Sequence, residues 1–244
     1  MNYYIEMTDN IQKKDNTKYP VIIGIDGDDT LWYTELVYER LYKQIKSLYS
    51  KEFNWSDDSF SIFLKSNIEL IGYGMKAYII SLIEYILSNT ESHSELLLKV
   101  IKWSKETWKE PIKLYDHAIE AVQYLSLNYK LVLITQGDNA EQHSKINRSG
   151  ILFKDVEIFS KKQEQAYLDF LKKRDMSPKQ FIMIGNSFKS DVLPVLNIGA
   201  KAIYIRSKWQ FEKIEDDLCH PNLFRADNLD QSLRILKRIV NEQY

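Results

Sequence analysis

The stretch VIIGIDGDDT, residues 21–30, decides the fold class. Its first half is a short apolar run, which is typical of a strand buried on both faces of a parallel sheet. Its second half places a glycine and three aspartates directly after that run. Four further short apolar runs follow later in the chain and predict four more strands: KLVLIT at 130–135, VEIFS at 156–160, FIMIG at 181–185 and AIYIR at 202–206.

Helical patterns separate the last four of these runs. They are AIEAVQYLSL before the second strand, NAEQHSKINRSG after it, QAYLDFLKKR after the third and SDVLPVLNIGA after the fourth. Strands that alternate with helices of this length indicate βαβ units and a parallel sheet. The sequence therefore predicts an α/β fold with a Rossmann-like parallel sheet at its core.

The region from 33 to 112 departs from this alternation. It contains helical patterns such as LVYERLYKQIKSLY, MKAYIISLIEYIL and ELLLKVIKWSKETW, and no convincing strand. About 80 residues between two strands are far more than one crossover needs. We interpret 33–112 as an inserted helical domain, 20–32 together with 113–244 as the core, and 1–19 as an N-terminal extension.

Composition excludes several classes of function. The chain has 244 residues and a formal net charge of -1, so no broad basic field favours nucleic-acid binding. One cysteine, Cys219, permits neither an internal disulfide nor a cysteine-based zinc site. The polar N-terminus lacks the apolar centre of a signal peptide, and no run approaches the length of a membrane span. A cytoplasmic protein without membrane or nucleic-acid partners is the expectation; the oligomeric state is open.

Polar side chains follow the predicted strands at the points where they end. Asp26-Gly27-Asp28-Asp29-Thr30 follows the first strand, Thr135-Gln136-Gly137 the second, Lys161-Lys162 the third, and Gly185-Asn186-Ser187 with Asp191 the fourth. Ligands of open α/β sheets bind at these carboxyl ends, so the side chains are expected to converge on one edge.

These residue types suit phosphoryl transfer. A carboxylate can act as the nucleophile, and several carboxylates can hold a hard cation such as Mg²⁺. A hydroxyl, a lysine and backbone N–H groups can neutralise phosphate oxygens, and the glycines at 27 and 137 allow the backbone to come close to the phosphate. Acids and glycines after strands are also common turn residues, so DGDDT alone would equally fit a plain loop.

Taken together, the motifs resemble those of the haloacid dehalogenase (HAD) superfamily. DGDDT resembles the first motif, Asp-x-Asp-x-Thr; LVLIT resembles the second, a strand ending in Thr; the lysine after the third strand resembles the third; and GNSFKSD resembles the fourth. They occur in the family order, each at a predicted strand end, over residues 20–206.

The resemblance implies a role for each residue. Asp26 is the nucleophile, and Asp28 is the general acid and base, which favours phosphate esters as substrates. Thr135 and a lysine bind the phosphate, with Gly27, Gln136 and Gly137 nearby. In the family pattern the metal, Mg²⁺, is held by the residues that correspond to Asp26, the Asp28 carbonyl, Asn186 and Asp191. Asn186 stands where many members carry an aspartate, so weaker Mg²⁺ binding is expected.

The choice of lysine rests on spacing. SKKQEQAY offers Lys161 and Lys162. The family subgroup with a GNSxxSD motif tends to have a tyrosine five residues after its lysine, and Tyr167 stands at that distance from Lys162. The resemblance therefore favours Lys162, with Lys161 as the alternative.

The inserted helices resemble a HAD cap, which covers the active site and supplies specificity contacts. Within them, Gly72 and Gly74 flank Tyr73 and predict a turn between two helices. Such a loop typically faces the active site, so Tyr73 is a candidate contact for the leaving group and Lys76 for a second anionic group. A simple turn with a solvated lysine is the equal alternative.

The function that the resemblance implies is a Mg²⁺-dependent phosphatase for a small phosphorylated metabolite, acting through an aspartyl-phosphate on Asp26. Three alternatives remain open at this point. They are a phosphomutase of the same superfamily, a phosphoprotein phosphatase, and a catalytically silent binding module.

Overall fold

The computed structural model describes residues 21–50, 55–89, 91, 94–206 and 218–243. The predicted extension at 1–19 lies outside these residues. The core is a parallel sheet of β1 (Ile22–Ile25), β2 (Lys130–Gln136), β3 (Val156–Phe159), β4 (Phe181–Gly185), β5 (Lys201–Ile205) and β6 (Leu223–Ala226), in the order β3-β2-β1-β4-β5-β6. The predicted α/β fold with a Rossmann-like sheet is confirmed.

The strand order reverses between β1 and β4. From β1 the chain adds β2 and then β3 on one side, and later places β4, β5 and β6 on the other. Ile25 pairs with Leu133 in β2 and with Ile184 in β4, so β1 is the central strand. Ligands bind outside the carboxyl ends of the strands at such a switch point, which is where Asp26 stands.

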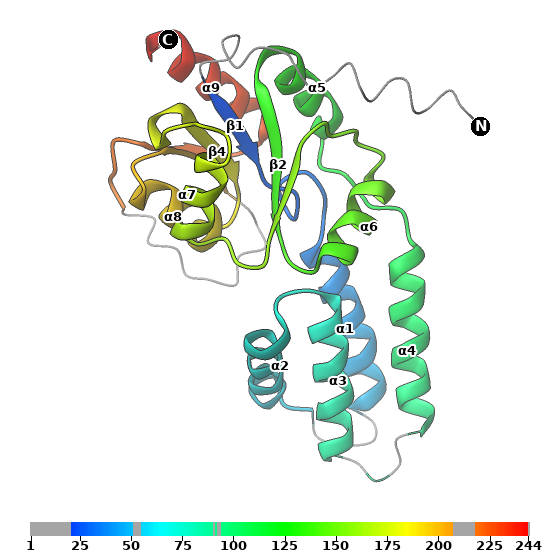
Figure 1. Cartoon of the computed structure of the whole chain (residues 1–244). Helices are drawn as coiled ribbons and strands as arrows, with labels where there is room; N and C mark the ends of the chain where they lie inside the picture. Colours follow the sequence, from blue (N-terminus) through cyan, green and yellow to red (C-terminus); the bar gives the residue numbers. More distant parts are fainter. Residues whose placement is uncertain (1–20, 51–54, 90, 92–93, 207–217, 244) are drawn as a thin grey trace, which may run out of the picture.

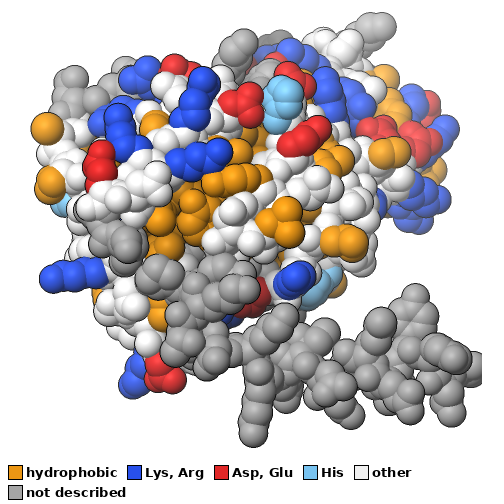
Figure 2. Space-filling view, turned by 90° about the horizontal axis from the view of Figure 1, so that it is seen from above, with side chains coloured by type: hydrophobic (Ala, Val, Ile, Leu, Met, Phe, Trp, Pro, Cys, Tyr) orange, Lys and Arg blue, Asp and Glu red, His pale blue; other side chains and the backbone are white. Residues whose placement is uncertain are grey.

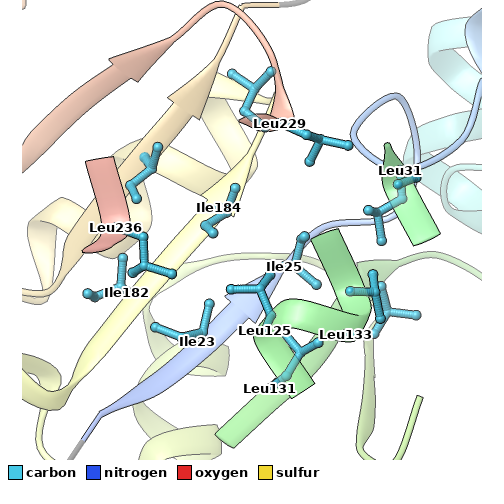
Figure 3. Packing of buried hydrophobic residues seen from close by; sticks show 14 of the residues in the cluster. Ile23, Ile25, Leu31, Leu125, Leu131, Leu133, Ile182, Ile184, Leu229 and Leu236 are labelled. Atoms are coloured by element: carbon cyan, nitrogen blue, oxygen red, sulfur yellow. The ribbon is translucent and has the colours of Figure 1, made fainter. Parts of the chain in front are cut away.

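Helices cover both faces of the sheet because β1, β2 and β4 are apolar on both sides. One face packs on α5 (Ala118–Asn128), α6 (Asn139–Ser149) and α9 (Leu229–Gln243), with Ile25, Leu133 and Ile184 at the centre. Figure 3 shows Leu125 of α5 beside Ile25, and Leu236 of α9 beside Ile182. The other face packs on α7 (Glu164–Lys172) and α8 (Leu193–Asn197).

The inserted cap consists, in the described residues, of α1 (Glu35–Tyr49), α2 (Asp57–Ile71), α3 (Met75–Asn89) and α4 (Ser94–Lys109). Figure 1 shows these helices as a separate bundle beneath the carboxyl ends of the strands. They bury a core of their own, which includes Leu41, Tyr85 and Val100. Ser56 caps the N-terminus of helix α2, and its side chain accepts a hydrogen bond from the Ser59 amide at 3.2 Å.

Two adjacent linkers join the cap to the core. Trp32 forms an isolated antiparallel bridge with Leu114, and the Tyr33 amide donates to the Lys113 carbonyl at 2.9 Å. The rings of Tyr33 and Tyr115 stack with centroids 3.9 Å apart. The outgoing and returning segments therefore form one short paired ribbon, which we call the hinge.

At the end of the molecule opposite the cap, hydrophobic side chains are exposed among charged side chains of both signs (Figure 2). None of the helices in the described ranges combines the length and apolar character that crossing a membrane requires.

Candidate active site

Asp26 lies at the end of the central strand and is almost completely buried, with 4% of its surface exposed. Its backbone amide donates to the Ile184 carbonyl at 2.9 Å, which extends the β1–β4 pairing by one residue. Its Oδ2 accepts a hydrogen bond from the Thr30 hydroxyl at 3.2 Å. The carboxylate is therefore fixed by the sheet on one side and by its own loop on the other.

Lys162 places its ammonium group between two buried carboxylates. Nζ lies 2.5 Å from Asp26 Oδ1 and 2.7 Å from Asp191 Oδ1, and all three side chains are buried. The neighbouring Lys161 is exposed. Of the two lysines that the sequence offered, the structure brings Lys162 into the site.

The electrostatics of this group are set by burial. Burial raises the pKa of Asp26 to about 7; Lys162 opposes the shift, and Asp191 adds to it. Burial alone would lower the pKa of the Lys162 ammonium, but Asp191 and Asp26 outweigh it and raise that pKa. A further cation beside Asp26 would favour its ionised form.

The loop after β1 turns tightly around Gly27. A Cβ built on Gly27 would lie 2.3 Å from Cζ2 of Trp32, so only glycine fits beneath that ring. The Gly27 carbonyl accepts from the Leu31 amide at 2.8 Å. Gly27 is thus required by packing, and its predicted contact with phosphate stays a prediction. Asp29, at φ 55°, accepts from the amides of Thr34 and Glu35 and thereby caps α1.

The residues after β4 form a wide turn over Phe188–Val192, with five-residue hydrogen-bond spacing. This geometry is rare and often marks functional sites. The turn brings Asp191 back beneath the sheet, where its Oδ2 accepts from the Ser187 amide at 3.0 Å. The buried Tyr167 hydroxyl donates to the Ser190 carbonyl at 3.0 Å, so the tyrosine that selected Lys162 also supports this turn.

Oxygen donors for a hard cation gather at the same place. Asp26 and Asp191 share Lys162, and the Asn186 Oδ1 accepts from Thr30 at 3.1 Å, the same hydroxyl that contacts Asp26. Carboxylate and amide oxygens are the ligands that Mg²⁺ prefers. Within the described part of the chain, no group of three or more His, Cys, Asp or Glu side chains is arranged for a metal; this set has two carboxylates and one amide.

The second predicted motif, at the end of β2, lies on the strand next to the one that carries Asp26. Thr135 is fully buried, and its hydroxyl donates to Gln142 Oε1 at 3.1 Å. Gln136 uses its side chain to accept from the Lys162 amide at 2.7 Å, so it positions the lysine segment. Gly137 adopts φ +139°, a conformation that L side chains rarely adopt.

Asp28 points toward helix α6 and is held there by five contacts. Its Oδ1 accepts from Thr34 at 2.6 Å and from Trp32 at 2.8 Å, and its Oδ2 accepts from Gln142 at 3.1 Å. Lys145 Nζ lies 3.1 Å from Oδ1 and 3.0 Å from Oδ2. Burial alone would raise the pKa of Asp28, but Lys145 and these hydrogen bonds outweigh it and lower the pKa to about 2.

The cap loop between α2 and α3 rests on the N-terminal half of α6. The amide of Met75, the first residue of α3, donates to both carboxylate oxygens of the buried Glu141 at 3.0 and 3.2 Å. Lys76 forms a salt bridge with Asp138 at 2.8 Å, and Tyr73 is 49% exposed. The loop therefore contacts the core beside the site. Whether Tyr73 and Lys76 bind a substrate stays a prediction, and the present partner of Lys76 is Asp138.

Comparison with known proteins places this geometry in a family. A family model described as haloacid dehalogenase-like hydrolase matches residues 22–199, which include β1 to α8 and every residue of the site. The chain belongs to this family. The membership of the HAD superfamily that the sequence motifs predicted is thus confirmed.

The relatives of this HAD-like hydrolase agree in fold. A haloacid dehalogenase-like family hydrolase from Xanthomonas campestris is 29% identical, with a TM-score of 0.81 over 95% of this chain and 98% of that one. The HAD hydrolase YfnB from Bacillus subtilis, in a structure bound to magnesium, is 15% identical, with a TM-score of 0.63 over 90% and 99%.

A relative with a named enzymatic activity matches part of the chain. Glyceraldehyde 3-phosphate phosphatase from Methanothermobacter thermautotrophicus is 31% identical over 90 residues. The match spans 34% of the HAD-like chain and 40% of the relative, so it covers well under half of either protein.

Three side chains around Asp28 were not predicted. Glu141, Gln142 and Lys145 lie on α6, whose sequence reads as an ordinary polar helix. Glu141 and Lys145 are four residues apart, a spacing typical of a solvated helix pair. In this HAD-like hydrolase both are buried beneath the cap, and the sequence held no signal that distinguishes the two situations.

Proposed function

We propose that this HAD-like hydrolase is a Mg²⁺-dependent phosphatase that acts on a small phosphorylated metabolite through a phosphoryl group carried on Asp26. The observation that supports this most strongly is the buried contact of Lys162 with Asp26 and Asp191 at the switch point of the sheet. A carboxylate nucleophile, a fixed cation beside it and a second carboxylate are the parts that phosphoryl transfer needs. The partial match to a phosphatase is consistent with it.

In the first half-reaction an Asp26 carboxylate oxygen attacks phosphorus, and the bond from phosphorus to the ester oxygen breaks. Lys162, beside Asp26, is placed to neutralise the phosphoryl oxygens as charge develops. Asp28 gives its proton to the departing ester oxygen. Since Lys145 and Thr34 hold Asp28 ionised in the present arrangement, this step requires that the carboxyl first leave Lys145 and take up a proton.

In the second half-reaction Asp28 removes a proton from water, and the oxygen of that water attacks phosphorus. The bond from phosphorus to Asp26 breaks, inorganic phosphate leaves, and the Asp26 carboxylate is restored. Thr135, at the end of β2, is placed to donate to a phosphoryl oxygen once its hydroxyl leaves Gln142.

Mg²⁺ would be held by Asp26, Asp191, Asn186 and the backbone carbonyl of Asp28, and would screen the negative charge of the phosphoryl group when bound. Asn186 supplies an amide where a carboxylate would add charge. We therefore propose a relatively weak Mg²⁺ site that is completed by the substrate phosphate.

Phosphate esters are favoured over halogenated acids by Asp28. An L-2-haloacid dehalogenase has a similar fold, so the fold alone does not determine which bond is cleaved. An acid two residues after the nucleophile supplies the proton that an alkoxide leaving group needs, whereas a halide leaves without one. A phosphomutase, a phosphoprotein phosphatase and a silent binding module remain the alternatives.

The cap favours a small substrate over a protein. Met75 and Lys76 of the cap loop contact Glu141 and Asp138 at the start of α6, so the cap is held against the core on the side of the strand ends. A folded phosphoprotein would have to displace these contacts. We propose a cytoplasmic enzyme whose partner is a metabolite and neither a nucleic acid nor a membrane.

Release of inorganic phosphate from a panel of sugar phosphates, nucleotides and phosphopeptides tests the proposal. We expect hydrolysis of small phosphate monoesters with Mg²⁺, and none by Asp26→Asn. Transfer to a sugar hydroxyl without phosphate release would identify a phosphomutase, and activity confined to phosphopeptides would identify a protein phosphatase. No turnover of any member would favour the silent module.

A further inference from the structure

A cavity of about 510 Å³ lies at the hinge, between the cap and helix α6. Its walls come from both linkers, from the first turns of α1, from the end of α4 and from α6. The volume is within the range of small-molecule sites. Among its described lining residues, Asp26, Lys162 and Asp191 are absent. The cavity is therefore lined by residues other than the nucleophile and its lysine.

The positively charged side chains that line this hinge cavity outnumber the negatively charged ones. Five cations and three glutamates line it. Three of the cations have carboxylate partners: Lys43 pairs with Glu39, Arg40 with Glu110, and Lys145 with Glu141 and Asp28. In the described ranges of the chain, the other two cations, Lys113 and Arg148, have no carboxylate at ion-pair distance.

Arg148 is half-buried, and its hydrogen bonds run to backbone carbonyls; burial lowers the pKa of its guanidinium, and the nearby Glu141 and Glu110 carboxylates oppose that shift. Its Nη1 donates to the Glu110 carbonyl at 2.8 Å, and its Nε lies 3.4 Å from the Ser144 carbonyl. A partly desolvated guanidinium whose hydrogen bonds run only to neutral carbonyls gains a charge-assisted bond from an added anion, and such bonds are the stronger kind. Lys113 lies on the hinge itself, with Nζ 5.0 Å from the centre of the Tyr33 ring.

The rest of the wall is aromatic and aliphatic. Tyr33, already stacked on Tyr115, faces the cavity together with Trp108, Val37 and Ile112. Flat apolar side chains beside two cations without carboxylate partners suit a ligand with an aromatic body and one anionic group. We propose that the hinge cavity binds a small aromatic carboxylate, with its carboxylate on Arg148 and Lys113 and its ring against Tyr33 and Trp108.

Calorimetric titration of the full chain with naphthoate tests this site, and the neutral naphthamide is the matched ligand control. We expect naphthoate to bind, and naphthamide to bind at least about tenfold more weakly, since it lacks the charge-assisted contacts. Arg148→Met and Lys113→Met should each raise the Kd for naphthoate by roughly tenfold. Lys113 is exposed, so its variant keeps the test valid if Arg148→Met does not fold.

Lys237→Met is the matched protein control. Lys237 lies 4.4 Å from the centre of the Tyr124 ring, a similar cation–aromatic pair outside the cavity. Its Kd for naphthoate should equal that of the wild type. Equal affinity for naphthoate and naphthamide would overturn the proposal, as would unchanged affinity in both cavity variants. Displacement of naphthoate by inorganic phosphate with Mg²⁺ would also overturn it, because the ligand would then occupy the phosphate site. Each measurement records binding and not turnover. The result would therefore still test the hinge cavity if the protein proved not to be a phosphatase.

Discussion

Lys145 contacts both carboxylate oxygens of Asp28, at 3.0 and 3.1 Å. The lysine is 6% exposed and lies 3.7 Å from Glu141, which in turn accepts the Met75 amide of the cap. Lys145 therefore holds Asp28, the proposed acid, in its ionised form. The same lysine contacts Glu141, the carboxylate on which the cap rests. The ionisation state of Asp28 depends on groups outside the four family motifs.

Asp28→Asn should lower kcat for an alkyl phosphate by roughly 10²–10⁴-fold, because the leaving alkoxide loses its proton donor. The loss should be smaller for p-nitrophenyl phosphate, since nitrophenolate leaves with less assistance. Steady-state rates with both substrates measure the difference, and Asp58→Asn on the exposed start of α2 is the control. Equal losses with the two substrates would show that Asp28 does not protonate the leaving group.

Asp26→Asn should abolish phosphate release and preserve the fold. The amide has the size of the carboxylate, and Lys162 keeps its contact with Asp191. We therefore expect no rearrangement of the site. Phosphate release and circular dichroism on the same preparation are the measurements. Turnover by a folded Asp26→Asn protein would mean that another group carries the phosphoryl.

Lys162→Ala should reduce kcat/KM by about 10²-fold or more, as expected for loss of a charge that stabilises the transition state. It should also lower Tm, because two buried carboxylates are left facing each other. Lys161→Ala changes a neighbouring, exposed residue and should leave both quantities near the wild type. The opposite ranking of the two variants would transfer the role to Lys161.

Chelation by EDTA should abolish turnover, and added Mg²⁺ should restore it. Asp191→Asn should raise the Mg²⁺ concentration needed for half-maximal activity, because it removes a charged ligand. Asn186→Asp should lower that concentration by adding one. Activity in metal-free buffer, or an Asn186→Asp variant with a higher Mg²⁺ requirement, would contradict the proposed ligand set.

Glu35 should make the protein less stable as pH rises. Burial raises its pKa from 4.5 to about 8, with Asp29 and Asp28 adding to the shift. A raised carboxyl pKa means that the folded state binds the proton more tightly, so this contribution is present at low pH and is lost as pH rises toward about 8. Glu35→Gln should therefore gain stability relative to the wild type by on the order of 1 kcal/mol between about pH 5 and pH 8.

Urea unfolding at several pH values measures this difference. Glu69→Gln, on the exposed surface of α2, is the control and should run parallel to the wild type. A stability gap for Glu35→Gln that stays constant with pH would show that Glu35 does not titrate in this range.

The core strands were predictable because they are buried on both faces and therefore uniformly apolar. FIMIG at 181–185 coincides with β4, and the other predicted strands shift by one residue at one or both ends. Strand β6 was not predicted. It consists of only four residues, LFRA, in which an arginine interrupts the apolar run, and it lies at the edge of the sheet where one side needs no apolar cover.

The site was predictable only where function depends on residues at strand ends. Asp26, Thr135, Asn186 and Lys162 could be placed together because parallel strands bring their carboxyl ends to one edge. The contacts of Asp28 with Lys145, and of Glu141 with the cap loop, depend on how α6 packs beneath the cap. Packing between the cap and the core produces no periodic pattern of residues in the sequence. These contacts can therefore be recognised only in the structure.

The paired linkers make the cap an independent module of the chain. Because Tyr33 and Lys113 already face each other as neighbours in an antiparallel ribbon, a turn of about two residues would be enough to join them. Deleting the intervening helices would leave every strand of the sheet and its order intact. The same junction could accept a different set of helices. One core domain can therefore be combined with many caps when the segment between Tyr33 and Lys113 is replaced.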